Sequence, residues 1–87
     1  MSWQVILSKK AVKDARNLKS VGLKNQTESL LNILQENPYM SPPPFEKLVG
    51  NLKGFYSRRI NIQHRIIYTV DNDRHIVHVL RMWTHYE

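Results

Sequence analysis

The sequence predicts an α+β fold in which two N-terminal helices pack on one face of a small, twisted, mainly antiparallel sheet. Apolar residues recur at helical spacing in the first half of the chain. The second half instead consists of short apolar runs that polar turns separate. The expected order is strand, helix, helix and three sequential strands, and we expect residues 1–87 to form one domain because 87 residues can bury one modest core.

The first strand is expected over residues 2–8, which contain a short apolar run. Ser8 can cap the helix that follows, because a hydroxyl at this position accepts a hydrogen bond from a first-turn amide. The apolar stripe of this helix consists of Ala11, Val12, Ala15 and Leu18. Val21–Gly22 breaks the helix. The lysines around the stripe form either a solvated face or a surface that contacts phosphate.

A second helix is expected from about Leu23 to Asn37. Its apolar face consists of Leu23, Thr27, Leu30, Leu31 and Leu34. The helix ends at Asn37, because the residue before a proline is disfavoured in the helical conformation. Residues 37–50 then form a proline-punctuated connection, and its stiffness fixes where Glu46 projects.

Two strands of a hairpin are expected over residues 55–61 and 64–70, with the turn centred on Ile62. In this register Arg59 and Arg65 lie opposite each other on one face of the sheet. Two cations that face each other across a strand pair are destabilising without a counter-ion. The pair is therefore either compensated by a nearby acid or held ready for an anion.

The last strand is expected roughly over residues 74–83, after the polar turn Asp71-Asn72-Asp73. It is apolar on both faces, which is typical of a central strand. The tail, residues 84–87, leaves the end of this strand and contains His85 and Tyr86.

Composition narrows the classes of function. Thirteen Lys and Arg against seven Asp and Glu give a formal charge of +6, which favours a polyanionic partner: nucleic acid, an acidic protein or an anionic surface. The alternative is that the charge serves solubility alone. The absence of cysteine excludes disulfides and thiolate chemistry.

No apolar run approaches the roughly 20 residues of a membrane span, and no export signal is recognisable, so we expect a cytoplasmic protein. No calcium-loop, P-loop or dinucleotide motif is present, and neither metal nor cofactor is expected.

The remaining polar side chains suit cleavage of RNA without a metal. They are Glu46, Arg59, Arg65, His85 and Tyr86. A carboxylate can take the proton of a 2′-hydroxyl, and a histidine with a pKa of about 6.5 can protonate the departing 5′-oxygen. Arginine suits phosphate oxygens, and an aromatic ring can stack on a base. The alternative interpretation of the same residues is a surface salt bridge, ordinary strand charges and a frayed terminus.

Three segments of the chain form a recognisable combination: Glu46-x-Leu48-x-x-Asn51-Leu52-x-Gly54-Phe55-Tyr56-Ser57-Arg58-Arg59-Ile60, His64-Arg65-Ile66-Ile67-Tyr68 and the terminal His85-Tyr86. In this combination the chain resembles the YoeB (Txe/YoeB) family, toxins of type II toxin–antitoxin systems within the RelE superfamily. It implies a RelE-like, microbial-RNase-like α+β fold, β-α-α-β-β-β. It also implies a metal-independent endoribonuclease that cleaves mRNA in the ribosomal A site.

The resemblance further implies a role for each polar residue. Glu46 would be the general base, and His85 the general acid. Arg65 and Arg59 would stabilise the scissile phosphate, and Tyr86 would position the nucleotide. The neighbouring cations expected to bind RNA are Arg58, Lys47 and Lys53.

The implied partners are a cognate YefM/Axe-like antitoxin, the ribosome with its mRNA, and a second copy of the chain in a homodimer. No membrane partner is expected. The alternative function is a non-catalytic RNA- or ribosome-binding module, whose charge serves binding alone. Cleaved message distinguishes the two functions.

Overall fold

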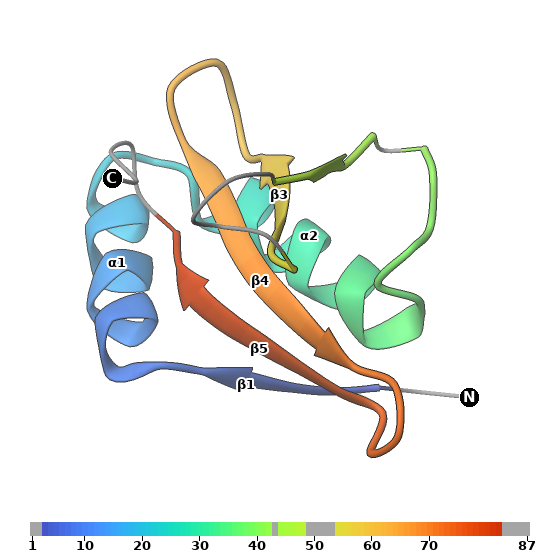
Figure 1. Ribbon diagram of the computed structural model, residues 1–87. Coiled ribbons are helices and arrows are strands. Elements are labelled where there is room, and N and C mark those ends of the chain that lie inside the picture. The colour runs from blue at the N-terminus through green and yellow to red at the C-terminus, as the bar shows by residue number, and fades with distance from the viewer. Residues whose placement is uncertain (1–2, 43, 49–53, 83–87) are drawn as a thin grey trace.

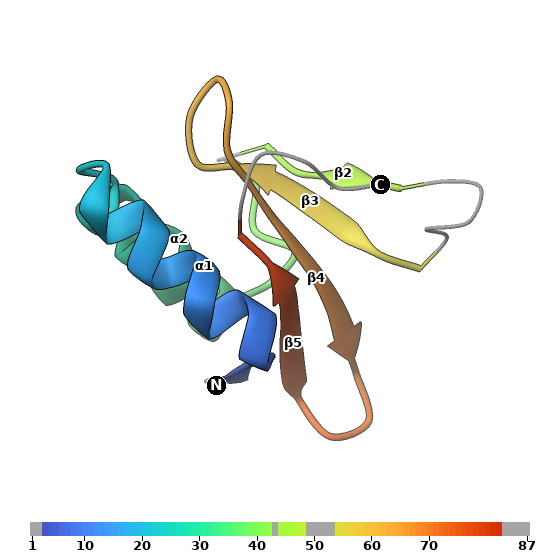
Figure 2. The same cartoon turned by 90° about the vertical axis from the view of Figure 1, so that its left-hand side faces the viewer.

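The computed structural model describes residues 3–42, 44–48 and 54–82. In these ranges the elements are β1 (Gln4–Leu7), α1 (Lys9–Ser20), α2 (Lys24–Glu36), β2 (Glu46–Lys47), β3 (Tyr56–Arg59), β4 (Arg65–Asp71) and β5 (Ile76–Arg81). Both helices lie on one side of the sheet (Figures 1 and 2). The predicted α+β arrangement of two helices on a small sheet is therefore confirmed.

The strands form one five-stranded sheet in the order β1-β5-β4-β3-β2. β1 pairs with β5 in parallel, and the other neighbouring pairs are antiparallel. β5 lies between β1 and β4, which agrees with the prediction that the last strand is central. It begins at Ile76 and not near Arg74, because residues 72–75 complete the turn from β4.

The short edge strand β2 is an element that the sequence does not predict. Glu46 pairs with Ser57 and Lys47 pairs with Tyr56, within the stretch expected to be a connection. The pairing continues as the Leu48 amide donates to the Phe55 carbonyl at 2.9 Å. Two residues are too few to show an alternating apolar pattern, so only the structure reveals this strand.

The core lies between the helices and the sheet. Its buried members are Ala11, Leu18, Leu30, Leu34, Ile60, Ile66, Tyr68, Val77, Val79 and Met82. Burial of Thr27, Leu30 and Leu34 confirms the predicted inner face of α2. The predicted stripe of α1 is correct in part, because Val12 is 41% exposed and Asp14 is buried in its place.

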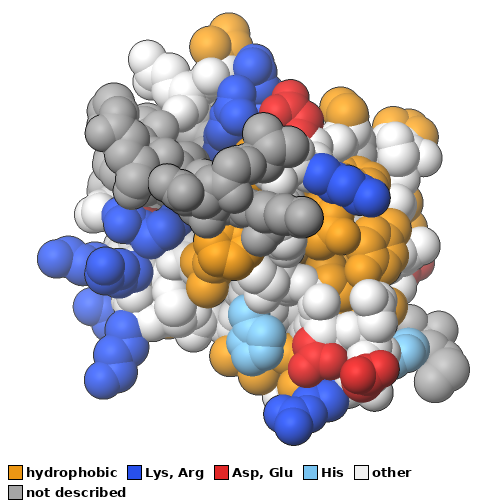
Figure 3. All heavy atoms as spheres, in the orientation of Figure 1, with side chains coloured by type: hydrophobic (Ala, Val, Ile, Leu, Met, Phe, Trp, Pro, Cys, Tyr) orange, Lys and Arg blue, Asp and Glu red, His pale blue; other side chains and the backbone are white. Residues whose placement is uncertain are grey.

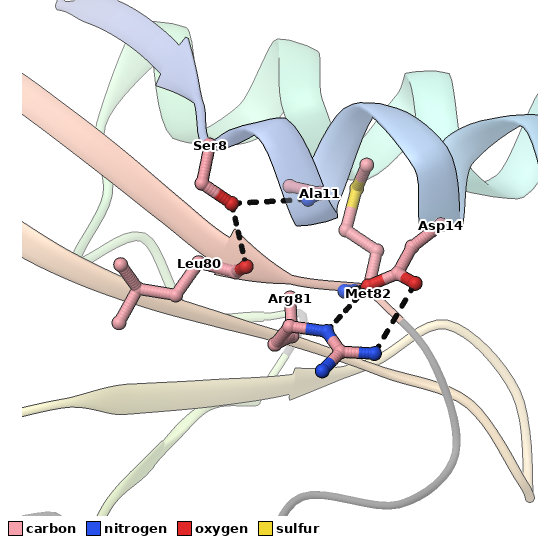
Figure 4. Close-up of polar contacts among 6 residues, drawn as sticks. All are labelled: Ser8, Ala11, Asp14, Leu80, Arg81 and Met82. Carbon is pink, nitrogen blue, oxygen red and sulfur yellow. Dashed lines mark hydrogen bonds and ion pairs between the residues drawn. The ribbon is translucent and has the colours of Figure 1, made fainter.

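Helix α1 is tied to the end of β5 by two polar side chains (Figure 4). The predicted cap is confirmed, since Ser8 Oγ accepts from the Ala11 amide at 3.0 Å. The same hydroxyl donates to the Leu80 carbonyl at 2.8 Å. Asp14 Oδ2 accepts from Arg81 Nε at 2.8 Å and from the Met82 amide at 3.1 Å. These bonds hold residues 80–82 against α1.

Candidate active site

The β3–β4 hairpin brings two arginines together on one face of the sheet. Arg59 pairs directly with Arg65, which confirms the predicted register. Directly paired residues project to the same face, whereas the next residues along each strand project to the other. Ile66 accordingly lies in the core beneath the helices. The arginine pair therefore lies on the face away from the helices.

Glu46 reaches the same face from the edge strand. It pairs with Ser57, two residues before Arg59 on β3. Its Oε2 lies 3.9 Å from Arg65 Nη1, and the Glu46 side chain is 67% exposed. An exposed ion pair at this distance contributes at most about 1 kcal/mol to stability. An acid thus compensates the arginine pair in part, and an entering anion can compete for the same guanidinium.

A pocket of about 140 Å³ opens where these residues meet. Its walls are formed by Pro44, Phe45, Glu46, Ser57, Arg59 and Arg65. Since a water molecule occupies roughly 30 Å³ in the liquid, this space admits a phosphate group. A carboxylate therefore faces two guanidinium groups around a volume that suits one phosphate.

Ser57 belongs to this pocket although the sequence analysis does not single it out. Only 3% of the residue is exposed, and it lies opposite Glu46 in the β2–β3 ladder. Strand alternation would have identified it, because residues 57 and 59 share a face. A small side chain at this position leaves room between the carboxylate and the arginines.

The burial of Arg58 contradicts the prediction that this residue binds RNA. The residue is 1% exposed, and its Nη2 donates to the carbonyls of Pro38 at 3.0 Å and Met40 at 2.7 Å. Its Nε donates to the Tyr68 hydroxyl at 3.2 Å, and its guanidinium carbon lies 4.9 Å from the centroid of the Phe45 ring. A side chain enclosed in this way presents no surface to RNA. Alternation explains the error, since neighbours in a strand project to opposite faces.

Burial raises the pKa of the Tyr68 phenol above its ordinary value of 10.0, although the cation of Arg58 beside it acts in the opposite direction. The hydroxyl therefore keeps its proton at neutral pH. It donates that proton to the Pro38 carbonyl at 2.9 Å. Arg58 and Tyr68 thus hold the same carbonyl from two directions.

Of the other predicted site residues, one lies on the surface and three lie outside the described residues. Lys47 is exposed on β2 beside Glu46. His85, Tyr86 and Lys53 lie outside the described residues, and their roles stay predictions. The chain enters the segment that contains His85 and Tyr86 from Met82, whose amide Asp14 holds.

Two further findings concern residues 3–42, 44–48 and 54–82. These ranges contain no group of three or more His, Asp or Glu side chains placed to hold a metal ion. Neither helix there has the length and apolar character needed to cross a membrane.

Comparison with known proteins gives consistent matches. A family model described as "YoeB-like toxin of bacterial type II toxin-antitoxin system" matches residues 10–86. The curated protein "Toxin YoeB" of Synechocystis sp. is 35% identical over 65 residues, which cover 74% of this chain and 69% of the relative. Two solved structures from Staphylococcus aureus have similar folds over 99% of this chain and 100% of theirs. One is a YoeB–YefM complex, with a TM-score of 0.78 and 29% identity. The other is a YoeB dimer, with a TM-score of 0.79 and 28% identity.

Proposed function

Because the chain belongs to the YoeB family of toxins of bacterial type II toxin–antitoxin systems, we propose that it is an endoribonuclease that cleaves mRNA in the ribosomal A site. The observation that supports this proposal is the pocket in which Glu46 faces the Arg59–Arg65 pair. Cleavage there blocks translation of the message. The nucleophile is the 2′-hydroxyl of the RNA itself, so the reaction needs no metal-bound water.

In the proposed mechanism Glu46 takes the proton of the 2′-hydroxyl, and the 2′-oxygen attacks the adjacent phosphorus. The bond from phosphorus to the 5′-oxygen breaks, and His85 gives that oxygen a proton. The products are a 2′,3′-cyclic phosphate and a 5′-hydroxyl. Arg59 and Arg65 donate to phosphate oxygens whose charge grows in the transition state. Tyr86 positions the nucleotide.

Binding energy from outside the pocket supports these steps. Lys47 and Lys53 are proposed to contact phosphates beside the site. Exposed cations also gather over α1, at the left of Figure 3: Lys9, Lys10, Lys13, Arg16 and Lys19. Such charges can bind a phosphate backbone without requiring exact geometry. Ribosomal RNA would supply that backbone.

The proposed partners are translating ribosomes with mRNA, a cognate YefM/Axe-like antitoxin and a second copy of the chain. The solved YoeB–YefM complex and YoeB dimer of Staphylococcus aureus support the last two. The formal charge of +6 also suits an acidic antitoxin. The cytoplasm is the proposed location, because translating ribosomes are found there.

A second candidate function is a non-catalytic ribosome-binding module, which the exposed cations of α1 favour. Expression without antitoxin distinguishes the two, with protein synthesis and the 5′ ends of messages as the measurements. We expect the wild-type chain to arrest synthesis and to create new 5′ ends, and His85→Ala to abolish both effects.

The matched control is His78→Ala, which removes an exposed histidine of β5 that does not line the pocket. This variant should arrest synthesis as the wild type does. Arrest by the wild type with intact messages would favour the binding module over the nuclease.

A further inference from the structure

We propose that Arg58 is a positioning residue that holds Glu46 in place from within the core. The inference rests on the proposed function, which makes Glu46 the general base. Arg58 lies on β3 between Ser57 and Arg59, which both line the pocket, but its own side chain points to the opposite face. Strand β3 thus contributes Ser57 and Arg59 to the pocket on one face, and on its other face it carries Arg58, which supports the proposed base.

The first contacts of Arg58 hold the start of the segment that leads to Glu46. Nη2 donates to the carbonyls of Pro38 and Met40, at 3.0 and 2.7 Å. The Tyr68 hydroxyl accepts from Arg58 Nε at 3.2 Å and donates to the Pro38 carbonyl at 2.9 Å. Hydrogen bonds from a charged donor are roughly twice as strong as neutral ones. The path from α2 towards the edge strand is therefore attached to β3 and β4.

A second contact lies directly before the base. The guanidinium carbon of Arg58 lies 4.9 Å from the centroid of the Phe45 ring, and Phe45 also lines the pocket. The ring packs against Tyr39 and Tyr56, with centroids 6.4 and 5.9 Å away. A cation over an aromatic face is attracted to the ring, and the attraction is stronger when the cation is desolvated. Arg58 therefore holds Phe45, the residue that directly precedes Glu46 in the chain.

This support is needed because β2 is short. Its pairing with β3 consists of two residue pairs, extended by the Leu48 amide bond to Phe55. Those contacts hold Glu46 itself and the two residues that follow it in the chain. Arg58 holds residues that precede Glu46 in the chain. Misplacement of a catalytic group by about 1 Å can lower a rate on the order of 100-fold, so the second anchor has consequences for catalysis.

The arginine side chain is specific to this task. Among the described residues, its planar group donates to the oxygens of Pro38, Met40 and Tyr68 and also lies over the Phe45 ring. Lysine carries a compact charge that lacks this fixed fork of donors. Arg58→Lys keeps the charge and loses the geometry.

The test is a double-mutant cycle on the single-turnover rate of mRNA cleavage by saturating enzyme on programmed ribosomes. We expect Arg58→Lys to lower this rate about 100-fold in the wild-type background and less than about threefold in the Glu46→Gln background. An equal loss in both backgrounds would show that Arg58 does not act through Glu46, and would overturn the inference alone. If Glu46→Gln itself leaves the rate unchanged, the proposed base is wrong and the inference falls with it.

Tyr68→Phe provides a second variant that keeps the ring and removes the hydroxyl bonded to Arg58 and Pro38. We expect a loss of rate of about tenfold that also disappears in the Glu46→Gln background. The control is Leu34→Ala, which removes a buried core side chain of α2. At a temperature where it is folded, Leu34→Ala should cleave at the wild-type rate. A loss of rate as large as that of Tyr68→Phe would overturn the inference.

Amide hydrogen exchange supplies a readout that is independent of activity. The Met40 amide donates to the Asn37 carbonyl at 3.0 Å, and the Thr27 amide donates to the Leu23 carbonyl at 3.0 Å in α2. Arg58→Lys should speed exchange of the first amide at least tenfold and leave the second unchanged. Equal acceleration at both positions would show general destabilisation and would contradict a positioning role.

Discussion

Arg65→Ala is expected to lower the single-turnover rate of mRNA cleavage on ribosomes by about 10²–10³-fold. The side chain faces Arg59 across the hairpin and lies 3.9 Å from Glu46. In the proposed mechanism, removal of this side chain takes away a donor to the growing charge on the phosphate. Glu46→Gln removes the proposed base, and we expect it to lower the same rate by about 10²–10⁴-fold.

The control for Arg65→Ala is Arg74→Ala. The Arg74 side chain is 79% exposed, pairs with Asp71 in the β4–β5 turn and lies outside the pocket. It should cleave within about twofold of the wild type, as surface changes away from the site usually have little effect. Urea unfolding should give Arg65→Ala a midpoint near the wild-type value, because the Glu46 side chain of the pair is 67% exposed and such pairs add little stability. Equal rates for the two alanine variants would contradict the assignment of Arg65.

Asp14→Ala is expected to lower the free energy of unfolding by about 2–4 kcal/mol. Asp14 is 4% exposed, and its carboxylate accepts from Arg81 and from the Met82 amide (Figure 4). Breaking a buried ion pair costs about 3–5 kcal/mol. We expect somewhat less because the Arg81 side chain is 38% exposed. Urea denaturation at pH 7 measures the change.

Two comparisons sharpen the Asp14 prediction. Asp73→Ala removes an exposed acid from the β4–β5 turn and should change stability by less than about 0.5 kcal/mol. Asp14→Asn keeps one acceptor oxygen and should cost less than Asp14→Ala. A loss in Asp14→Ala no greater than that in Asp73→Ala would show that the contact between α1 and β5 is not a structural anchor.

The arginine pair could be predicted from the sequence because its causes are local. A turn centred on Ile62 fixes the register, and strand alternation then places Arg59 and Arg65 together. The Ser8 cap is local in the same way, since its acceptor and donor lie three residues apart. Each of these features follows from the spacing within one element or one hairpin.

The features that the sequence did not predict depend on distant partners. Asp14 resembles one more solvated charge on α1, because Arg81 lies 67 residues away. The parallel pairing of β1 with β5 joins the two ends of the fold, and periodicity carries no information about such a partner. Charge alone groups Arg58 with the neighbouring RNA-binding cations, whereas its contacts in the fold include the carbonyls of Pro38 and Met40.

The chemistry of the message ends tests the proposed nuclease most directly. Purified wild-type protein is incubated with ribosomes stalled on a defined mRNA, and both fragments are analysed. We predict a cut within the A-site codon, a 2′,3′-cyclic phosphate on the upstream fragment and a 5′-hydroxyl on the downstream fragment. An intact message on blocked ribosomes, or a downstream fragment that carries a 5′-phosphate, would contradict attack by the 2′-hydroxyl in the Glu46–Arg59–Arg65 pocket.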